Sequence, residues 1–267
     1  MNIAFWNTHK NKEINEFLML MMIENDIDIM IIAEYEDNIN CLINDLYIRD
    51  MWYIKAPIIA CKKIKMLYKK GITVEINFDC SNYVSMFISK DTLEFELFTT
   101  HFPSKLYTSD DNRKLIARVL KDNIERYDKA IVVGDFNCNP FETTVSALSG
   151  LLALPTKEYK KRRVAGVEKR ILYNPMWKFL GGFEVGSGTY FYNSSDDLNY
   201  YWNLFDQVLI SQELTEKFNN DKLKIVNEIN KKSLLNEKKI NTKISDHLPI
   251  VFSIEEDKNG RNMEKKI

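Results

Sequence analysis

Two short segments of the chain carry residues of the kinds that hydrolyse phosphate esters. In VVGDFN, Asp135 and Asn137 stand two positions apart, so in extended backbone their side chains face the same way. This pairing places a base beside a donor for phosphate. In SDH, Asp246 and His247 come directly before a proline and an apolar run, which would hold both at the edge of a strand. Phosphodiester hydrolysis needs bound metal, activated water and donors for the transition state, and side chains of these types serve each need.

Two further carboxylates lie at the ends of apolar runs. Glu34 follows IDIMIIA, and an oxygen ligand at the end of a buried strand suits Mg²⁺ or Mn²⁺. Asp206 opens DQVLIS, where a buried carboxylate beside a histidine would fix its tautomer and favour its charged form. Taken alone, Glu34 also fits a solvated loop, Asp206 a turn, and Asp135 to Pro140 an Asx turn that caps a helix. The functional interpretation therefore depends on the segments occurring together.

The predicted elements would bring these segments to one place. Residues 2–6 indicate a strand followed by a helix, and residues 27–33 a buried strand, which makes a βαβ unit. Short β-rich stretches between residues 51 and 100 then predict a meander of antiparallel strands. Residues 115–124 predict an amphipathic helix, and residues 130–133 a buried strand that ends at GDFNCNP. The order strand, helix, strand and polar turn occurs twice, so two facing halves would place their polar loops together.

Length and composition favour one domain. We expect it to cover residues 1–254, with an insertion at about residues 151–203 that is in turn glycine-rich, aromatic and basic. Residues 255–267 are strongly charged, which predicts a disordered tail. The four cysteines stand far apart, without a CxxC pair or a histidine at zinc-ligand spacing. Neither a disulfide framework nor a zinc knuckle is therefore indicated.

Charge and hydropathy limit the partners. The chain has 37 basic and 38 acidic residues and a net charge of −1, so no global positive field draws it to nucleic acid. Binding to a polyanion must then come from local patches. No apolar run is long enough to span a bilayer, and the first ten residues lack the pattern of a secretory signal. We therefore expect a cytoplasmic monomer that does not associate with membranes.

The order of the motifs resembles a known family. The segments WN, AE, TH, GDFN, FDQVLIS and SDHLPI follow one another as in the endonuclease/exonuclease/phosphatase superfamily, whose fold is deoxyribonuclease I-like, and the resemblance covers the whole chain. Similar members include deoxyribonucleases, abasic-site endonucleases, inositol polyphosphate 5-phosphatases, neutral sphingomyelinases and deadenylases, which cleave phosphoester bonds, usually with Mg²⁺. The resemblance implies an α/β fold, a four-layer α/β/β/α sandwich with two mixed sheets and the site at one sheet edge.

The resemblance also implies roles for individual residues. Asp135 would orient or deprotonate the attacking water, Asn137 would bind the scissile phosphate, and His247, steered by Asp206, would contact the phosphate. His101 would stabilise the phosphoryl oxygens or protonate the leaving group. The implied catalytic residues are His101, Asp135, Asn137, Asp206 and His247, and the implied metal-binding residues are Asn7, Glu34 and Asp246, with Mg²⁺ or Mn²⁺ as the ion.

One departure from the family pattern concerns His101. In deoxyribonuclease-like members the equivalent histidine leans on a glutamate just before an early strand, but the stretch IKAPIIA offers no carboxylate. His101 is therefore expected to act only as a hydrogen-bond donor. His9, in the NTHKNK turn, is expected to be exposed to solvent.

Two segments bear on the substrate. Residues 157–170 hold seven basic residues against two acidic ones, which indicates a polyanion contact at Lys160, Lys161, Arg162 and Arg163 or, equally, a solvated loop. The segment TYFYNSSDDLNYYWNLFD is rich in aromatic residues, which stack on exposed bases of a single strand or pack a strand pair.

We predict a metal-dependent phosphodiesterase, and within that class an endo- or exonuclease that cleaves DNA or RNA. Two alternatives stay open. One is a phosphatase or phosphodiesterase of a small phosphate ester or lipid. The other is a catalytically dead module that only binds nucleic acid, but none of the implied metal or base residues is missing.

Overall fold

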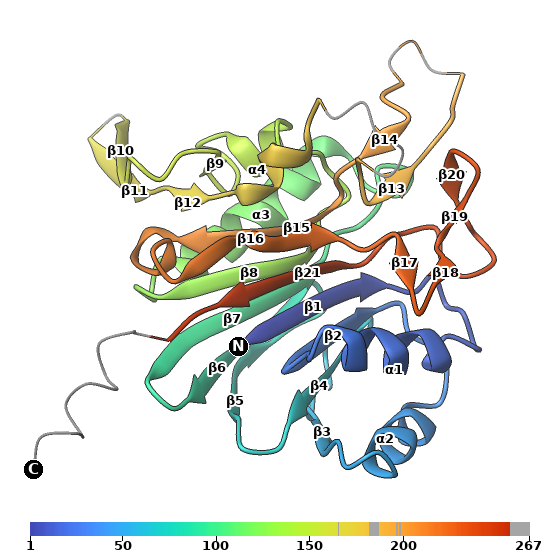
Figure 1. The fold of residues 1–267 in the computed structure, drawn as a ribbon. Coiled ribbons are helices and arrows are strands. Elements are labelled where there is room, and N and C mark those ends of the chain that lie inside the picture. The colour runs from blue at the N-terminus through green and yellow to red at the C-terminus, as the bar shows by residue number, and fades with distance from the viewer. Residues whose placement is uncertain (165, 182–186, 196, 198, 257–267) are drawn as a thin grey trace, which may run out of the picture.

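The computed structural model describes residues 1–267 apart from 165, 182–186, 196, 198 and 257–267. Two mixed sheets pack face to face, and helices cover the outer face of each (Figure 1). The α/β four-layer sandwich is therefore confirmed. Among the described residues, no helix is long and apolar enough to cross a membrane. Most of the predicted tail lies outside the described residues, and the predicted bounds of the domain and its insertion stay predictions.

The first sheet has six strands, with both the first and the last long strand of the chain near its middle. Their order across the sheet is β16 (Phe218–Ile225), β21 (Ile250–Ile254), β1 (Asn2–Asn7), β2 (Ile29–Ala33), β4 (Ile64–Lys69) and β3 (Tyr53–Lys55). Only β1 and β2 pair in parallel, and the other neighbours are antiparallel. The helices α1 (Asn15–Glu24) and α2 (Ile39–Tyr47) cover its outer face.

The second sheet has seven strands. Their order is β5 (Thr73–Asp79), β6 (Tyr83–Lys90), β7 (Leu93–His101), β8 (Ala130–Asp135), β15 (Asp206–Ser211), β12 (Leu172–Tyr173) and β9 (Ala153–Leu154). The pairs β7–β8 and β12–β9 are parallel. The outer helices are α3 (Asp110–Ile124) and α4 (Thr143–Ser146), and two short 3₁₀ turns follow, η1 (Pro175–Phe179) and η2 (Gln212–Leu214).

Four small hairpins stand outside the two sheets. They are β10–β11 (Lys161–Val164 and Val167–Arg170), β13–β14 (Tyr190–Phe191 and Trp202–Asn203), β17–β18 (Glu228–Ile229 and Lys232–Ser233) and β19–β20 (Leu235–Asn236 and Lys239–Ile240).

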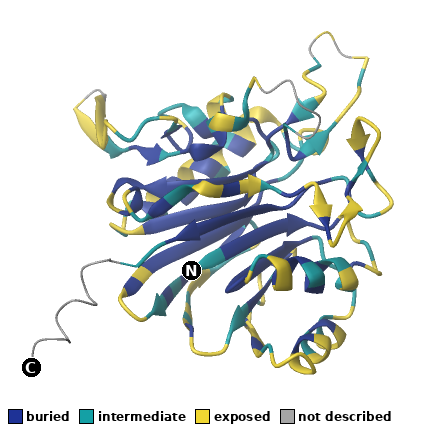
Figure 2. Cartoon of the chain, viewed as in Figure 1, coloured by how far each residue is buried: buried dark blue, intermediate teal, exposed yellow. Residues whose placement is uncertain are grey.

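The sequences of the long central strands are unbroken apolar runs, because one face of each sheet packs on the other sheet and the opposite face packs on helices. In β1, Ile3 and Phe5 belong to the core between the sheets, whereas Ala4 and Trp6 pack under the helices of the first layer. The long central strands are accordingly buried along most of their length (Figure 2). The layers are thus held by burial on both sides of each sheet.

The predicted meander between residues 51 and 100 is divided between the sheets. Strands β3 and β4 form an antiparallel pair in the first sheet, and β5, β6 and β7 form an antiparallel run in the second. The chain crosses between them at Gly71, whose φ of +99° favours glycine. The predicted stretches contain β3, β5, β6 and β7, but β4 lies in the lysine-rich segment between two of them and was not predicted. Alternation of side chains also carries no information on which sheet a hairpin joins.

Candidate active site

The polar residues singled out in the sequence meet where strands of both sheets end. In the register of the second sheet, His101 at the end of β7 and Asp206 at the start of β15 both lie opposite Asp135. In the first sheet, Asn7 ends β1 and Glu34 follows β2. Parallel pairing brings carboxyl ends of strands to one edge, and here two such edges face each other.

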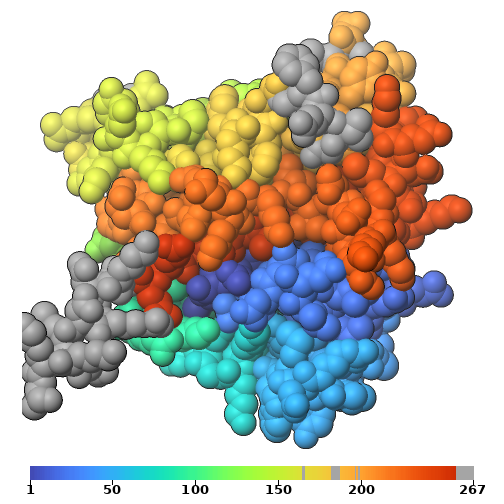
Figure 3. Space-filling view, in the orientation of Figure 1, coloured from blue at the N-terminus to red at the C-terminus, as the bar shows by residue number. Residues whose placement is uncertain are grey.

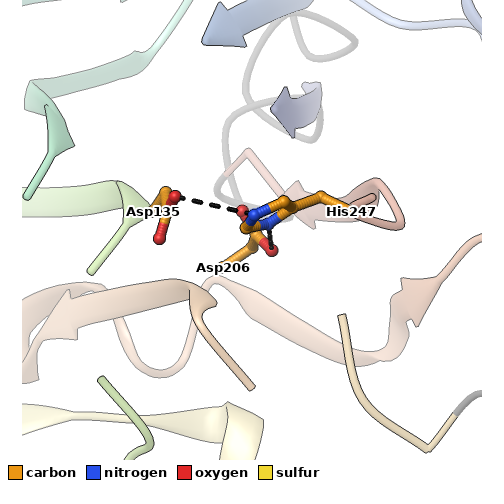
Figure 4. Close-up of side chains that lie close together, drawn as sticks. All are labelled: Asp135, Asp206 and His247. Carbon is orange, nitrogen blue, oxygen red and sulfur yellow. Dashed lines mark hydrogen bonds and ion pairs between the residues drawn. The ribbon is translucent and has the colours of Figure 1, made fainter. Parts of the chain in front are cut away.

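Asp206, His247 and Asp135 form a buried group (Figure 4). The Nδ1 atom of His247 lies 2.7 Å from Oδ2 of Asp206, and its Nε2 atom lies 3.9 Å from Oδ2 of Asp135. Burial by itself would lower the pKa of His247, but the neighbouring carboxylates of Asp206 and Asp135 raise that pKa well above its usual value. The imidazole is therefore held as a cation whose Nε2–H faces the site.

Two asparagines fix the carboxylate of Asp135. Asn7 donates from Nδ2 to Oδ2 of Asp135 at 3.1 Å, and Asn137 donates its backbone N–H to Oδ1 at 2.8 Å and its Nδ2 to Oδ2 at 3.2 Å. Asn137 adopts a left-handed φ of +48°, a conformation that asparagine tolerates. Only glycine fits at position 134, because an added Cβ would lie 1.9 Å from the carbonyl oxygen of Thr100 in β7. Close approach of β7 and β8 therefore sets the position of Asp135.

On the other side of the site, His101 contacts Glu34. Its Nε2 atom lies 3.1 Å from Oε1 of Glu34 and 3.6 Å from Oδ2 of Asp135. The hydrogen bond from His101 lowers the pKa of Glu34 to about 2, although burial opposes the shift. Instead of a carboxylate from residues 54–60, Lys63, directly before β4, places Nζ 3.2 Å from Nδ1 of His101. The motifs gave no signal for Lys63, because the segment KKIK offers three lysines and only the fold distinguishes them.

Asp246 lies at the edge of the same site. Its Oδ2 atom lies 3.1 Å from Nδ1 of His9, whose side chain is mostly exposed as expected. Its Oδ1 atom is buried and accepts no hydrogen bond within the part of the chain that the structure describes. The loop before it is anchored by Ser245, which donates Oγ to the carbonyl oxygen of Asn7 at 2.7 Å.

The donor set suits a hard divalent cation. Glu34, Asp246 and the amide of Asn7 supply the oxygen ligands that Mg²⁺ and Mn²⁺ prefer, and the buried Oδ1 of Asp246 has an unused lone pair. Ligand atoms of Asp135, Asp206 and His247 also lie within 4.8 Å of one another, which is close enough to hold an ion. Because Nδ1 of His247 is already bonded to Asp206, the oxygen set fits the ion better.

An aromatic stack stands beside His247. The ring of Tyr190 lies 4.8 Å from the His247 ring and 5.1 Å from that of Phe205, and Tyr192 stacks on Tyr190 at 6.3 Å. Tyr192 is 48% exposed, so the stack ends at the surface. Phe191 and other residues of this segment instead pack against the core beneath α1 and α2. The segment therefore provides both a packed strand pair and exposed rings.

The basic hairpin β10–β11 does not line this site. It stands at the opposite end of the molecule from β13, and Tyr190 in β13 bridges to His247 (Figure 1, Figure 3). Lys160, Lys161, Arg162 and Arg163 are all exposed on it, with Lys161 paired to Glu168. Their role as substrate contacts stays a prediction.

Comparisons with known proteins identify the family and the fold. The profile of the Endonuclease/Exonuclease/phosphatase family matches residues 56–256. An endonuclease/exonuclease/phosphatase family protein from Leptotrichia buccalis is 17% identical with a TM-score of 0.59, covering 96% of this chain and 100% of that one. TDP2 of D. rerio complexed with a single-strand DNA product is 17% identical with a TM-score of 0.58, covering 94% and 97%.

The 3′ phosphatase NExo from Neisseria, bound to a product DNA hairpin, is 10% identical with a TM-score of 0.53, covering 96% of this chain and 100% of that one. At these identities the structures share the fold. No curated protein matches the sequence. The matched profile extends over most of the chain, from the strands before His101 to the end of the last strand. The chain therefore belongs to the endonuclease/exonuclease/phosphatase family.

Proposed function

We propose that this chain is a metal-dependent nuclease that hydrolyses phosphodiester bonds of DNA or RNA. The observation that carries the choice of substrate is the stack of Phe205, Tyr190 and Tyr192 beside His247. A base next to the scissile phosphate would continue this stack, and stacking of a base on an aromatic ring contributes about 1–3 kcal/mol. Two structures of the same fold, those of TDP2 and NExo, hold DNA products, which supports the same class of substrate.

In the proposed reaction each residue acts from the position described above. His247 donates from Nε2 to a phosphate oxygen. Asn137 becomes a second donor to the phosphate by exchanging one of the two hydrogen bonds that its Nδ2 donates, to Asp135 and to the carbonyl oxygen of Phe102. Asp135 orients the attacking water and accepts its proton. A divalent ion held by Glu34, Asn7 and Asp246 would offset phosphate charge and favour ionisation of bound water. Asp206 keeps His247 oriented and charged.

The first experiment is a substrate panel with Mg²⁺ or Mn²⁺ and with EDTA. We expect cleavage of single-stranded oligonucleotides with the metal and none with EDTA. His247→Gln should lower kcat by about a hundredfold or more, and circular dichroism should show that the variant is still folded. Including a 3′-phosphorylated end and a soluble phosphomonoester in the panel distinguishes a nuclease from a phosphatase. Hydrolysis of monoesters alone would contradict the proposal.

The stacking argument has its own test. Tyr192→Ala should raise KM for an oligonucleotide about fivefold to a hundredfold, which corresponds to the loss of one stacked base. The same change should leave hydrolysis of a small phosphodiester without a base unaltered. Tyr47→Ala is the matched control, because Tyr47 is 55% exposed and ends α2 on the outer face of the first sheet. Equal effects of Tyr192→Ala on both substrates would exclude stacking as the basis of substrate choice.

A further inference from the structure

Lys63 lies in the site but has no role in the reaction proposed above. Its Nζ atom lies 3.2 Å from Nδ1 of His101 and 3.7 Å from Oε1 of Glu34. Both partners lie at the centre of the site, where His101 reaches Asp135 through Nε2 at 3.6 Å. Lys63 therefore places a cation directly beside His101 and Glu34.

The contacts of Lys63 determine the tautomer of His101. An ammonium group donates hydrogen bonds and accepts none, so Nδ1 of His101 must be the acceptor in this pair. The Nε2 atom of His101 then carries a proton, which faces Oε1 of Glu34 at 3.1 Å. His101 is thus a hydrogen-bond donor toward the centre of the site, and the ammonium group of Lys63 lies on the other side of its ring.

The ammonium group of Lys63 has one donor to spare. It carries three N–H groups, of which His101 and Glu34 account for two. The Lys63 side chain is 54% exposed while that of His101 is 4% exposed, so the remaining face of the ammonium group is open to solvent. An anionic oxygen that approaches the site can meet this donor without displacing either partner.

We propose that Lys63 is a catalytic residue that donates a hydrogen bond to a phosphate oxygen of the bound strand on the Glu34 side of the site. This assignment rests on the proposed function, because it takes a nucleic acid phosphate as the anion. Lys63 also holds His101 in its donor tautomer, so one side chain both contacts the substrate and orients a neighbouring donor. The site then binds phosphate from two sides, with His247 on one and Lys63 on the other.

The test compares Lys63→Gln with Lys62→Gln. Lys62 is the adjacent exposed lysine, and its backbone N–H bonds to Ala60. Binding of a fluorescein-labelled single-stranded oligonucleotide is measured by anisotropy in EDTA over a series of KCl concentrations, so neither turnover nor metal affinity enters. We expect Lys63→Gln to bind about fivefold to tenfold more weakly. Its slope of log affinity against log salt should fall by about 0.7. Lys62→Gln should match the wild type in both.

Two further variants separate phosphate contact from positioning. Lys63→Arg keeps both the charge and a donor and should retain most of the binding, whereas Lys63→Gln keeps a donor for Nδ1 of His101 but removes the charge. If Lys63 served only to position His101, Lys63→Gln would bind like the wild type, and this result would overturn the proposal. Phosphate contact instead predicts that Lys63→Glu, which reverses the charge, is the weakest binder of the series.

The two proposals fail in different ways. Suppose that the wild type binds and cleaves nucleic acid, but Lys63→Gln and Lys62→Gln have the same slope of log affinity against log salt. This result would show that Lys63 does not contact the substrate, and it would leave the nuclease assignment in place. A wild-type protein that neither binds nor cleaves any nucleic acid would overturn the proposed function and this inference with it. Circular dichroism of each variant shows whether a loss reflects unfolding.

Discussion

At the scale of the residue, the pair of Asp206 and His247 is the most constrained part of the site. Asp206 is fully buried and His247 is 5% exposed. An isolated buried charge is costly, so each side chain is stable there as an ion only because of the other. The tilted ring of Tyr190 lies at 4.8 Å and closes the imidazole off from water. Removing one member should therefore affect the other directly.

Asp206→Asn tests this dependence. The amide cannot hold His247 as a cation, so we expect kcat on an oligonucleotide to fall by about a hundredfold or more, while KM changes far less. Steady-state kinetics with saturating Mg²⁺ measures both. Asp221→Asn, at an exposed aspartate outside the site, serves as the control. A variant Asp206→Asn with wild-type kcat would show that His247 does not need the carboxylate.

The sequence predicted most of the residues that meet at the site, but it did not predict Lys63. Asp135 ends the apolar run of β8 and Asp206 begins that of β15, so antiparallel pairing of the two strands places both at one edge of the sheet. His101 reaches the same edge at the end of the parallel neighbour β7. Lys63 could not be foreseen, because lysines on exposed strand ends are common and only the packing of β4 against the site selects one of them.

At the scale of the element, the ends of the strands away from the site are joined by Asp28. This residue precedes β2 and accepts the backbone N–H of Asn2 at 2.7 Å. It also accepts Nζ of Lys90 in β6 at 3.1 Å, and Nζ of Lys69 in β4 lies at 3.7 Å. Since β6 belongs to the second sheet, the contact crosses between sheets. Burial would raise the pKa of Asp28, but the hydrogen bonds from Asn2 and Lys90 and the charge of Lys69 lower it overall.

Asp28→Asn should therefore destabilise the protein in a pH-dependent way. A carboxyl group with a lowered pKa in the folded state stabilises it above the unfolded pKa of about 3.9, and this contribution is lost as the pH falls through the lower folded value. At neutral pH we expect the free energy of unfolding to fall by about 1–3 kcal/mol. Urea titrations should show the difference from wild type shrinking below about pH 4.

Asp26→Asn provides the matched control for this prediction. Asp26 pairs with the same Lys69 but its side chain is 80% exposed, so its loss should cost about 0.5 kcal/mol or less. Equal effects of Asp26→Asn and Asp28→Asn would show that the burial of Asp28 and its contact with Lys90 do not matter.

The elements themselves were predicted unevenly. The unit of β1, α1 and β2 was correctly predicted, because its apolar spacing changes from strand to helix and back. The helix α2 was missed, although Asn38 caps it by accepting the backbone N–H groups of Asn40 and Cys41. Its buried face consists only of Leu42 and Leu46, which is too short a pattern to recognise by periodicity.

At the scale of the whole molecule, the distance between the site and the hairpin β10–β11 has consequences for substrate length. The strand β15 runs from Asp206 to Ser211, so its far end, where β12 pairs, lies roughly 17 Å from Asp206. The hairpin is anchored beyond that end, where Arg170 and Lys169 contact residues in and just after α3. A short substrate held at Asp135 cannot reach it, but a longer strand can contact both.

Replacing Lys160, Arg162 and Arg163 together with glutamine tests this separation. Cleavage of a trinucleotide should be unchanged, whereas binding of a long single strand should weaken, with a smaller dependence on salt. Anisotropy measurements with the two lengths use the same protein, so the short substrate is the internal control. Weaker cleavage of the trinucleotide would indicate damage to the fold or the site, and unchanged binding of the long strand would exclude the hairpin as a contact.

The place of β21 between β16 and β1 affects when the protein can act. Strand β1 gains its second neighbour only after residues 250–254 have been made, and Trp6 donates Nε1 to the carbonyl oxygen of His247 across 241 positions of sequence. Contacts of such long range form late and slowly. A nascent chain on the ribosome thus carries Glu34 and Asp135 long before His247 joins them. Under the proposed function, the protein would therefore become active only after translation has passed His247.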